Sequence, residues 1–316
     1  MTRPEPASSM RCTYSVVRTQ VVKWVVSLAA FACVVSLLSA GASTAAQRGG
    51  RIQFWSGRSG SPAVWDMRID GSGKRLLTRF PENAKRGVLS PDGRRLAFDG
   101  AAPGQQPMSN FDVQVMNIDG TKRVRLTSEP EKDIDAQWSP DGKLLTYTRQ
   151  ADDTGRKTTI WTMRTDGTHK RRLAAGQLAR WSPDGRRIVF GRWIGDHASL
   201  FILDLGSDRI TRLTTSPLYD EPAGWSPDGR TILFTRDNPG SGSDIYSIAA
   251  DGSSLRRLSL AASDDYACAF SPSGSEILFT SNRTGHDQVF IMRADGANAR
   301  NISRSVTDDE ATQWHS

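Results

Sequence analysis

Short segments in which hydrophobic and polar residues alternate recur along the chain from residue 51 onward. Five of them share one form and read RLAF (95–98), LLTY (144–147), RIVF (187–190), TILF (231–234) and EILF (276–279). Aromatic and β-branched residues at a period of two are typical of β-strands. Because no segment after residue 50 has the longer period of an amphipathic helix, the pattern predicts an all-β fold.

A tight-turn motif stands directly before each of these segments. It reads SPDG at Ser90–Gly93, Ser139–Gly142, Ser182–Gly185 and Ser226–Gly229, and SPSG at Ser271–Gly274. Proline suits the second position of a type I turn, and glycine suits the left-handed position that closes a bulged hairpin. The successive spacings are 49, 43, 44 and 45 residues, so the chain is built from a repeat.

Each repeat is long enough for four strands. A second turn marker follows each SPDG motif, at Asp119-Gly120, Asp166-Gly167, Asp251-Gly252 and Asp295-Gly296, with Gly206-Ser207 in its place in the remaining repeat. Two hairpin turns divide a repeat into four antiparallel strands. A four-stranded repeat of about 44 residues indicates a β-propeller, whose sheets, the blades, pack face to face around a channel.

The strands on either side of the SPDG turns predict six blades. The second strands are Arg51–Trp55, Arg95–Phe98, Leu144–Tyr147, Arg187–Phe190, Thr231–Phe234 and Glu276–Phe279, and the first strands end at Leu89, Trp138, Trp181, Trp225, Phe270 and Trp314. Arg51–Trp55 has no first strand before it, whereas Ala311–Trp314 has no second strand after it. These two segments are expected to pair and close the ring. The tryptophans that end first strands are expected to pack between blades.

The repeat also resembles that of a known family. WSPDGRRIVF (181–190), WSPDGRTILF (225–234) and IYSIAADGSSLRRL (245–258) are similar to the WD40-like repeats of the TolB propellers, and the resemblance covers residues 51–316. It implies a propeller that works outside the cytoplasm and docks a peptidoglycan-associated lipoprotein. Because only about four residues separate Ala46 from Arg51, we expect the N-terminal α/β domain of that family to be missing and the propeller to stand alone.

The N-terminal segment has the order of residues that is typical of a secretory signal peptide. Basic residues come first, an apolar run follows at 24–43, and small residues lead up to Ala46. The sequence therefore predicts a signal peptide at 1–46, cleaved near Ala46–Gln47, and a propeller at 47–316 in the periplasm or secreted. Since the apolar run is about 18 residues long, a retained membrane anchor with the propeller facing outside is the alternative.

Charge and cysteine content narrow the classes of partner. The chain carries a formal charge of +7, and residues 1–46 account for +3 of it through Arg3, Arg11, Arg18 and Lys23 against Glu5. The remaining charge of about +4 is too mild to indicate a nucleic-acid partner. Beyond the N-terminal segment Cys268 is the one cysteine, so a buried free thiol is expected there. We expect a monomer that contacts a membrane only if the N-terminal segment is retained.

The connections of the repeat differ between the two faces of the predicted propeller. The SPDG and DG turns share one face and are nearly uniform, which is typical of a scaffold. The opposite face carries the connections from second to third strands, which vary in length and character at 56–63, 99–110, 149–158, 191–198, 236–243 and 281–287. Variable loops around a channel indicate a recognition surface. The candidate partner-binding residues on this face are Asp135, Glu221, Asp308, Glu310 and Trp193.

An aspartate recurs five residues before the end of the first strand in four repeats, at Asp133, Asp220, Asp265 and Asp309. Gly176 and Ala84 stand at this position in the other two. Six-fold geometry would place the carboxylates around one mouth of the channel, where they could attract a cation such as calcium or a basic partner group. Alternatively, each side chain caps the turn that enters the strand. Both readings remain open from the sequence.

No arrangement of residues points to catalysis. The histidines are His169, His197, His286 and His315, and no two of them have the spacing of metal ligands. A G-x-S-x-G nucleophile motif is also missing. The sequence therefore favours an exported, non-catalytic propeller that binds a protein or peptide of the cell envelope and needs no cofactor apart from possible calcium. The alternatives are a carbohydrate-binding module and a carbohydrate-active lyase or hydrolase that uses the channel mouth.

Overall fold

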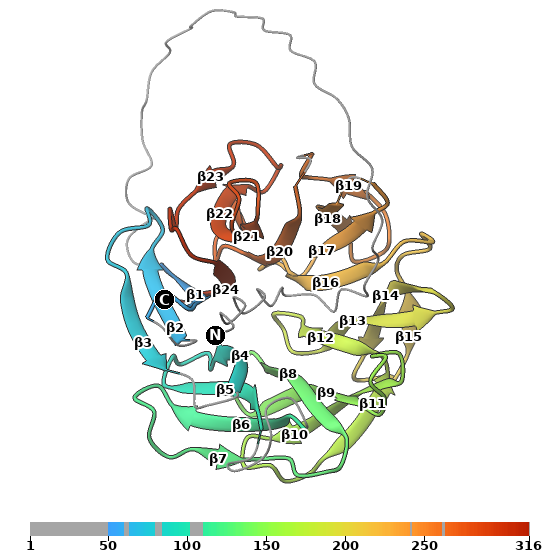
Figure 1. Cartoon of the computed structure of the whole chain (residues 1–316). Coiled ribbons are helices and arrows are strands. Elements are labelled where there is room, and N and C mark those ends of the chain that lie inside the picture. The colour runs from blue at the N-terminus through green and yellow to red at the C-terminus, as the bar shows by residue number, and fades with distance from the viewer. Residues whose placement is uncertain are drawn as a thin grey trace, which may run out of the picture. The chain divides into compact units, whose positions relative to one another are not determined.

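The protein forms a ring of six four-stranded antiparallel sheets (Figure 1). The computed structural model describes residues 50–59, 63–79, 84–101, 110–240, 242–260 and 263–315. The predicted all-β fold and six-bladed propeller are confirmed. The expectations for residues 1–46 lie outside the described residues and stay predictions. Within the described ranges, no helix is long and apolar enough to cross a membrane.

Each blade runs from an inner strand at the centre of the ring to an outer strand at its rim. Blade 1 consists of β24 (Asp309–His315), β1 (Arg51–Ser56), β2 (Ala63–Arg68) and β3 (Arg75–Arg79). Blade 2 consists of β4 (Ala84–Leu89), β5 (Arg95–Gly100), β6 (Asp112–Asn117) and β7 (Val124–Arg125). Blade 3 consists of β8 (Lys132–Trp138), β9 (Leu144–Gln150), β10 (Thr158–Arg164) and β11 (Arg171–Ala175).

The second half of the ring follows the same order. Blade 4 consists of β12 (Gln177–Trp181), β13 (Arg187–Ile194), β14 (His197–Asp204) and β15 (Ile210–Arg212). Blade 5 consists of β16 (Asp220–Trp225), β17 (Thr231–Asn238), β18 (Gly242–Ala249) and β19 (Arg256–Arg257). Blade 6 consists of β20 (Asp265–Phe270), β21 (Glu276–Ser281), β22 (Gln288–Arg293) and β23 (Arg300–Asn301).

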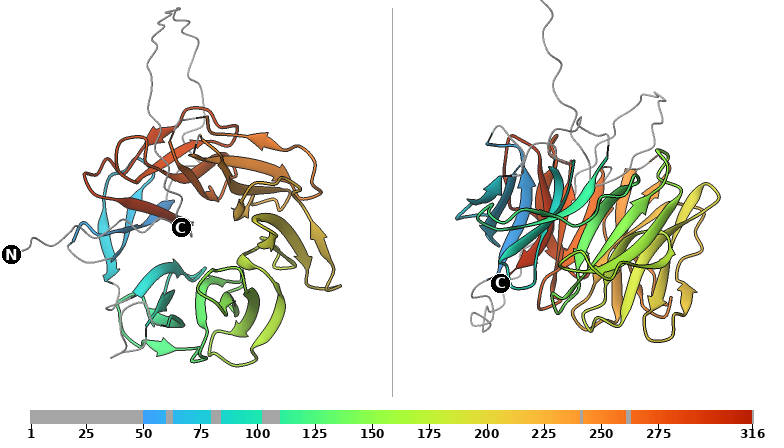
Figure 2. Two further views of the ribbon diagram at one scale, coloured as in Figure 1. Left: turned by 45° about the vertical axis from the view of Figure 1, so that its right-hand side comes forward. Right: turned by 90° about the horizontal axis from the view of Figure 1, so that it is seen from below.

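The end of the described chain completes the first blade. β24 pairs antiparallel with β1, with Ile52 opposite Trp314 and Phe54 opposite Ala311. The prediction that the C-terminal segment closes the ring beside Arg51–Trp55 is confirmed, and Figure 2 shows the last strand inside the same blade as the first. Closure gives β1 a hydrogen-bonded neighbour on its inner edge.

Every inner strand carries a β-bulge in its pairing with the second strand. A bulge bends its strand and re-aims the side chains around it. In β8 and β12 the bulges hold Asp135 and Leu178 at positive φ angles of 55° and 57°. The bulges therefore set the direction of the side chains that surround the centre of the ring.

Aromatic side chains hold neighbouring blades together, as expected for Trp138 and Trp225. The indole Nε1 of Trp138 donates to Val88 O at 3.1 Å, and Arg95 lies 4.6 Å from the centre of its ring. Trp225 repeats both contacts with Arg180 O and Arg187. In each case the partner residues belong to the preceding blade, so these contacts join blades 2 with 3 and 4 with 5.

Two of the predicted loops are wrong in extent. The segment 191–198 is mostly strand, because β13 and β14 stay paired up to Ile194 and His197 and turn through Gly195 and Asp196 alone. In the segment 236–243, β17 and β18 likewise stay paired up to Asn238 and Gly242. In both hairpins the backbone pairing continues beyond the residues whose hydrophobic alternation marks a strand in the sequence.

Candidate functional site

The SPDG turns satisfy their own polar groups. In blade 4 the Ser182 hydroxyl donates to Asp184 Oδ1 at 2.6 Å and accepts from Arg187 N at 2.9 Å. Asp184 Oδ1 also accepts from Arg186 N at 3.1 Å, and these hydrogen bonds, first the one from Ser182, lower the pKa of Asp184. The same contacts recur in blades 2, 3 and 5. Serine and aspartate are therefore needed to build the turn.

Two of the DG turns, those of Gly71 and Gly296, fit closely against the preceding blade. A Cβ atom on Gly71 would lie 2.1 Å from Ile302 O, and one on Gly296 would lie 2.4 Å from Leu258 O. Only glycine permits this approach. A hollow of about 470 Å³ lies on the same face between blades 5 and 6, and turn residues such as Ser226, Pro227 and Gly274 line it. This face is a uniform scaffold, and its hollows follow from the repeat.

On the opposite face, each recurring aspartate holds an arginine. Asp220 accepts from Arg236 Nε at 2.6 Å and from Nη2 at 2.9 Å, and Asp133 accepts from Arg149 in the same bidentate way. Arg283 donates to both oxygens of Asp265, and Arg58 pairs with Asp309. All four carboxylates are fully buried. A buried carboxylate of this kind is tolerated because it is paired and hydrogen-bonded.

The arginines of these pairs lie over aromatic rings of the second and third strands. Arg236 lies 5.3 Å from the ring centre of Phe234 and 5.0 Å from that of Tyr246. The same arrangement places Arg149 over Tyr147 and Trp161, Arg283 over Phe279 and Phe290, and Arg58 over Phe54 and Trp65. Each unit combines a carboxylate, a guanidinium and two rings, and we call it an Asp–Arg stack. Cation–π contacts add stabilisation to the ion pair.

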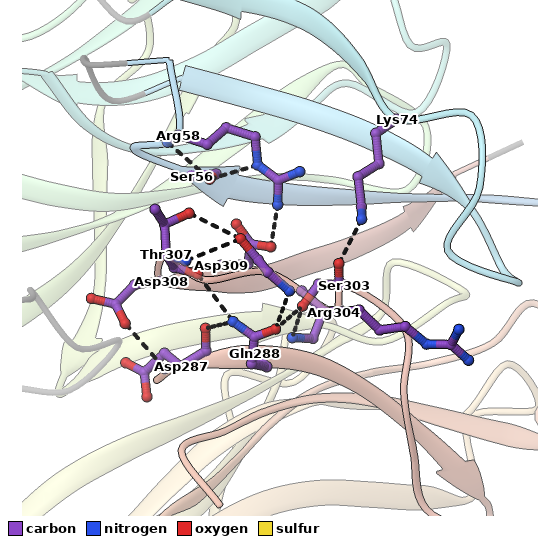
Figure 3. A network of polar contacts seen from close by, with 12 residues as sticks. Ser56, Arg58, Lys74, Asp287, Gln288, Ser303, Arg304, Thr307, Asp308 and Asp309 are labelled. Atoms are coloured by element: carbon purple, nitrogen blue, oxygen red, sulfur yellow. Dashed lines mark hydrogen bonds and ion pairs between the residues drawn. The ribbon is translucent and has the colours of Figure 1, made fainter. Parts of the chain in front are cut away.

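The Asp–Arg stack of blade 1 lies at the ring closure (Figure 3). Arg58 reaches Asp309 at the start of β24, and Ser56 Oγ accepts from Arg58 Nε at 3.1 Å. Gln288 Nε2 donates to Thr307 O at 3.0 Å and ties the preceding connection to blade 6. Lys74 Nζ donates to Ser303 O at 2.5 Å, which links blade 1 to the same connection. Polar contacts thus fasten the start of β24 and the connection that precedes it.

The structure gives the four aspartates arginine partners that neither reading of the sequence included. Among the described residues, no group of three or more His, Cys, Asp or Glu side chains is placed to hold a metal ion. Calcium binding at Asp133, Asp220, Asp265 and Asp309 stays a prediction. A cation at any of these four carboxylates would compete with the guanidinium already bound to it.

Three of the predicted partner-binding residues lie on inner strands, Asp135 on β8, Glu221 on β16 and Glu310 on β24. Asp135 accepts from Arg180 Nη1 at 2.8 Å, across the junction of blades 3 and 4. Burial raises the pKa of the Cys268 thiol to about 12, and the negative charges of Glu310 and Glu221 act in the same direction. The Cys268 thiol donates to Ala311 O at 3.0 Å. Acidic groups from blades 5 and 1 therefore lie near this thiol.

Of the two remaining candidates, Asp308 lies in the connection before β24, and Trp193 lies near the end of β13. Asp308 Oδ1 accepts from Asp287 N at 3.1 Å and lies 3.8 Å from His286 Nδ1. Trp193 donates from Nε1 to Gly155 O at 3.0 Å, and its ring centre lies 5.3 Å from that of Tyr219. Trp193 thereby links connections of blades 3 and 5. Partner binding by all five candidate residues stays a prediction.

Sequence reasoning missed the arginines of the Asp–Arg stacks. Arg149 and Arg236 follow the buried aromatic residue of the second strand by two positions. In blades 1 and 6 a serine occupies that position, and the arginine comes two residues later and donates from Nε to the serine hydroxyl. An arginine two or four residues beyond the strand aromatic is a signal that could have identified them.

Two exposed hydrophobic residues mark the connections from outer to inner strands. Val306 is 88% exposed and Leu260 is 79% exposed, more than any other large hydrophobic residue among those that the structure describes. Leu260 lies between β19 and β20, and Val306 lies between β23 and β24. The two residues therefore stand on successive connections of the face that carries the Asp–Arg stacks.

Comparison with known proteins agrees with this fold. Residues 175–262 match the family model described as the TolB beta propeller domain. The structure resembles TolB from Acinetobacter baumannii with a TM-score of 0.68 at 19% identity, over 84% of this chain and 66% of that one. A TolB-type protein from Agrobacterium tumefaciens has a TM-score of 0.63 at 21% identity, over 84% of this chain and 97% of that one.

A lyase shares the fold more distantly. Oligogalacturonate lyase in complex with manganese has a TM-score of 0.52 at 16% identity, over 79% of this chain and 71% of that one. No curated protein matches the chain. The resemblance to the TolB propellers is confirmed, and the chain has a six-bladed β-propeller fold similar to theirs. At these identities the likeness concerns the fold.

Proposed function

We propose that the chain is an exported, non-catalytic propeller that binds a protein or peptide of the cell envelope through the face bearing the Asp–Arg stacks. The observation that carries the proposal is the pair Leu260 and Val306, two nearly fully exposed hydrophobic side chains on successive connections of this face. Exposed hydrophobic residues that gather on one face favour contact with another protein. The residue order of 1–46 supports export.

The other exposed hydrophobic residues have a different setting. Leu76, Val124 and Ile210 belong to outer strands, and Leu255 directly precedes one. They recur around the rim with the repeat and are less exposed, at 37% to 52%. Singly scattered residues of this kind are normal on a protein surface, and they provide a matched control for the two residues on the stack-bearing face.

The test compares two double variants of equal chemistry. Leu260→Asp with Val306→Asp is expected to abolish capture of an envelope protein by crosslinking of the exported chain, as measured by mass spectrometry. Val124→Asp with Leu255→Asp introduces the same charges at the rim and is expected to leave capture unchanged. Loss of capture in the rim variant alone would refute the proposal. Selective binding of the unaltered protein on a glycan array, without protein capture, would instead support a carbohydrate ligand.

A further inference from the structure

Blade 4 contains the arginine of an Asp–Arg stack without the aspartate. In blades 3 and 5 the strand register sets Asp133 opposite Arg149 and Asp220 opposite Arg236. In blade 4 Gln177 pairs with Gly191, which sets Gly176 opposite Arg192. Arg192 therefore occupies the position of the paired arginines, and its expected partner residue has no side chain.

Arg192 keeps the aromatic half of the stack. Its guanidinium lies 5.3 Å from the ring centre of Phe190 and 4.7 Å from that of Phe201. Its Nε donates to Ala175 O at 2.8 Å. Within the described part of the chain, no ion pair joins Arg192 to a carboxylate. The rings hold the guanidinium in place while its charge remains unneutralised by an acidic group.

A second arginine adds to the positive charge at this position. Burial and the positive charge of Arg172 in β11 lower the pKa of Arg192. Arg172 is exposed, and Arg192 is partly exposed. The junction of blades 3 and 4 thus presents two cationic groups that solvent can reach. In blade 5, by contrast, the corresponding Arg236 is paired with a buried carboxylate.

The backbone at Gly176 leaves no room for an aspartate at the position that carries it in the other stacks. A Cβ atom on Gly176 would lie 2.5 Å from Phe190 Cδ2 and 2.7 Å from Gly191 O, and the φ angle of Gly176 is 145°. Blade 2 differs, because Ala84 lies opposite Gly100 and both partners of the stack are missing. Of the two blades that lack the aspartate, only blade 4 retains the arginine. The positive charge of Arg192 is therefore open to a partner from outside the blade.

We propose that Arg192, together with Arg172, binds a carboxylate of an acidic peptide through the guanidinium N–H groups that are not bonded to Ala175 O. A guanidinium held over aromatic rings suits a carboxylate, because its remaining N–H groups can donate two parallel hydrogen bonds. The carboxylate belongs either to an acidic side chain or to a peptide C-terminus. This inference rests on the proposed function, since it names a chemical group that the partner would present.

The experiment titrates the ¹⁵N-arginine-labelled protein with three short peptides and follows the Nε–Hε resonance of Arg192 by NMR. The probes are Ac-Gly-Glu-Gly-NH₂, Ac-Gly-Gly-Gly-OH and the uncharged Ac-Gly-Gln-Gly-NH₂. We expect saturable shifts with one or both carboxylate peptides and none with the glutamine peptide. The response of the first two probes identifies a side-chain or a C-terminal carboxylate as the ligand.

Three variants assign the binding to these residues. Arg192→Gln is expected to weaken carboxylate binding about tenfold or more, Arg192→Lys to weaken it less, and Arg172→Gln to weaken it by a smaller factor still. Arg186→Gln removes an exposed arginine from the turn face of the same blade and is expected to change nothing. If Arg192→Gln fails to fold, the resonance in the unaltered protein and the Arg172→Gln variant still decide the question.

Several outcomes would overturn the inference. These are the absence of a saturable shift, equal binding of the glutamine peptide, equal binding by the Arg192→Gln variant, and tighter binding of digalacturonate or inorganic phosphate than of either carboxylate peptide. If Arg192→Gln leaves partner capture intact while Leu260→Asp with Val306→Asp abolishes it, the proposed function survives and the carboxylate site does not.

Discussion

Blades 3 and 4 each place an arginine over an aromatic ring of the second strand and one of the third strand, yet the two arginine charges are balanced differently. Arg149 in blade 3 contacts two carboxylates, Asp133 at 2.8 Å and Glu129 at 3.1 Å. Arg192 in blade 4 contacts none among the described residues. The rings position the guanidinium in both blades, so the carboxylate is the part of the stack that varies. Adjacent blades of one repeat can therefore differ in local charge without a change in fold.

The pKa values of the two arginines are shifted in opposite directions by these surroundings. In blade 3 the hydrogen bond and charge of Asp133 raise the pKa of Arg149 above its usual value. In blade 4 burial and Arg172 lower the pKa of Arg192. Arg149 is neutralised by a buried carboxylate of its own blade. The charge of Arg192 is not neutralised in this way and is available to a ligand.

The largest effect is expected in blade 1, where the two halves of the stack come from opposite ends of the described chain. Removal of residues 311–316 deletes most of β24, including the buried Ala311 and the pairing of Trp314 with Ile52. We expect a loss of about 4 kcal/mol or more in the free energy of unfolding, because a core strand is lost. Urea denaturation measures it, with Val306→Ser as a control of unchanged stability. An unchanged melting temperature would contradict the role of β24.

A smaller but still large loss is expected in blade 3. Arg149→Gln leaves Asp133 fully buried without its bidentate partner. Removal of one partner of a buried ion pair costs about 3–5 kcal/mol. Urea denaturation at pH 7 measures the change, and a loss below 1 kcal/mol would show that Asp133 can be accommodated without the arginine.

The second carboxylate of blade 3 is expected to make stability depend on pH. Burial raises the pKa of Glu129, but the hydrogen bonds from Ser128 N and Lys170 and the charge of Arg149 outweigh it and lower the pKa to about 2. A carboxyl group whose pKa is lower in the folded protein stabilises the fold at pH values above its pKa in the unfolded chain. This contribution is lost as the pH falls through the pKa of the folded state. Between pH 5 and 2 the free energy of unfolding of the unaltered protein should therefore fall by about 1 kcal/mol more than that of the Glu129→Gln variant. Parallel pH profiles of the two proteins would contradict this.

The smallest effect is expected in blade 4. Arg192→Gln removes two cation–π contacts and one hydrogen bond, but it also removes a partly buried charge without a carboxylate. We expect a change within about 1 kcal/mol, measured by urea denaturation beside Arg149→Gln. A loss as large as that of Arg149→Gln would show that Arg192 is structural and would remove the contrast between the two blades.

The fold could be predicted because short sequence motifs mark the turns of each repeat. Glycine in the SPDG turn and the strand alternation after it are local signals, and counting them placed the closing strand correctly. The Asp–Arg stacks were missed because their partners lie at unequal distances along the chain. Asp220 and Arg236 are 16 residues apart, whereas Asp309 and Arg58 are 251 apart. The bulges of the inner strands also lack a local signal, since the curvature of the ring requires them.

The closing strand has a consequence for protein synthesis. Arg58 and Asp309 are separated by 251 residues, and a ribosome adds roughly 5–20 residues per second, so the partner of β1 emerges roughly 10–50 seconds after β1 itself. During that interval the inner edge of β1 has no neighbour, and unpaired strand edges invite association with other chains. Until the last strand is available, the ring of every new copy therefore stays open at this edge.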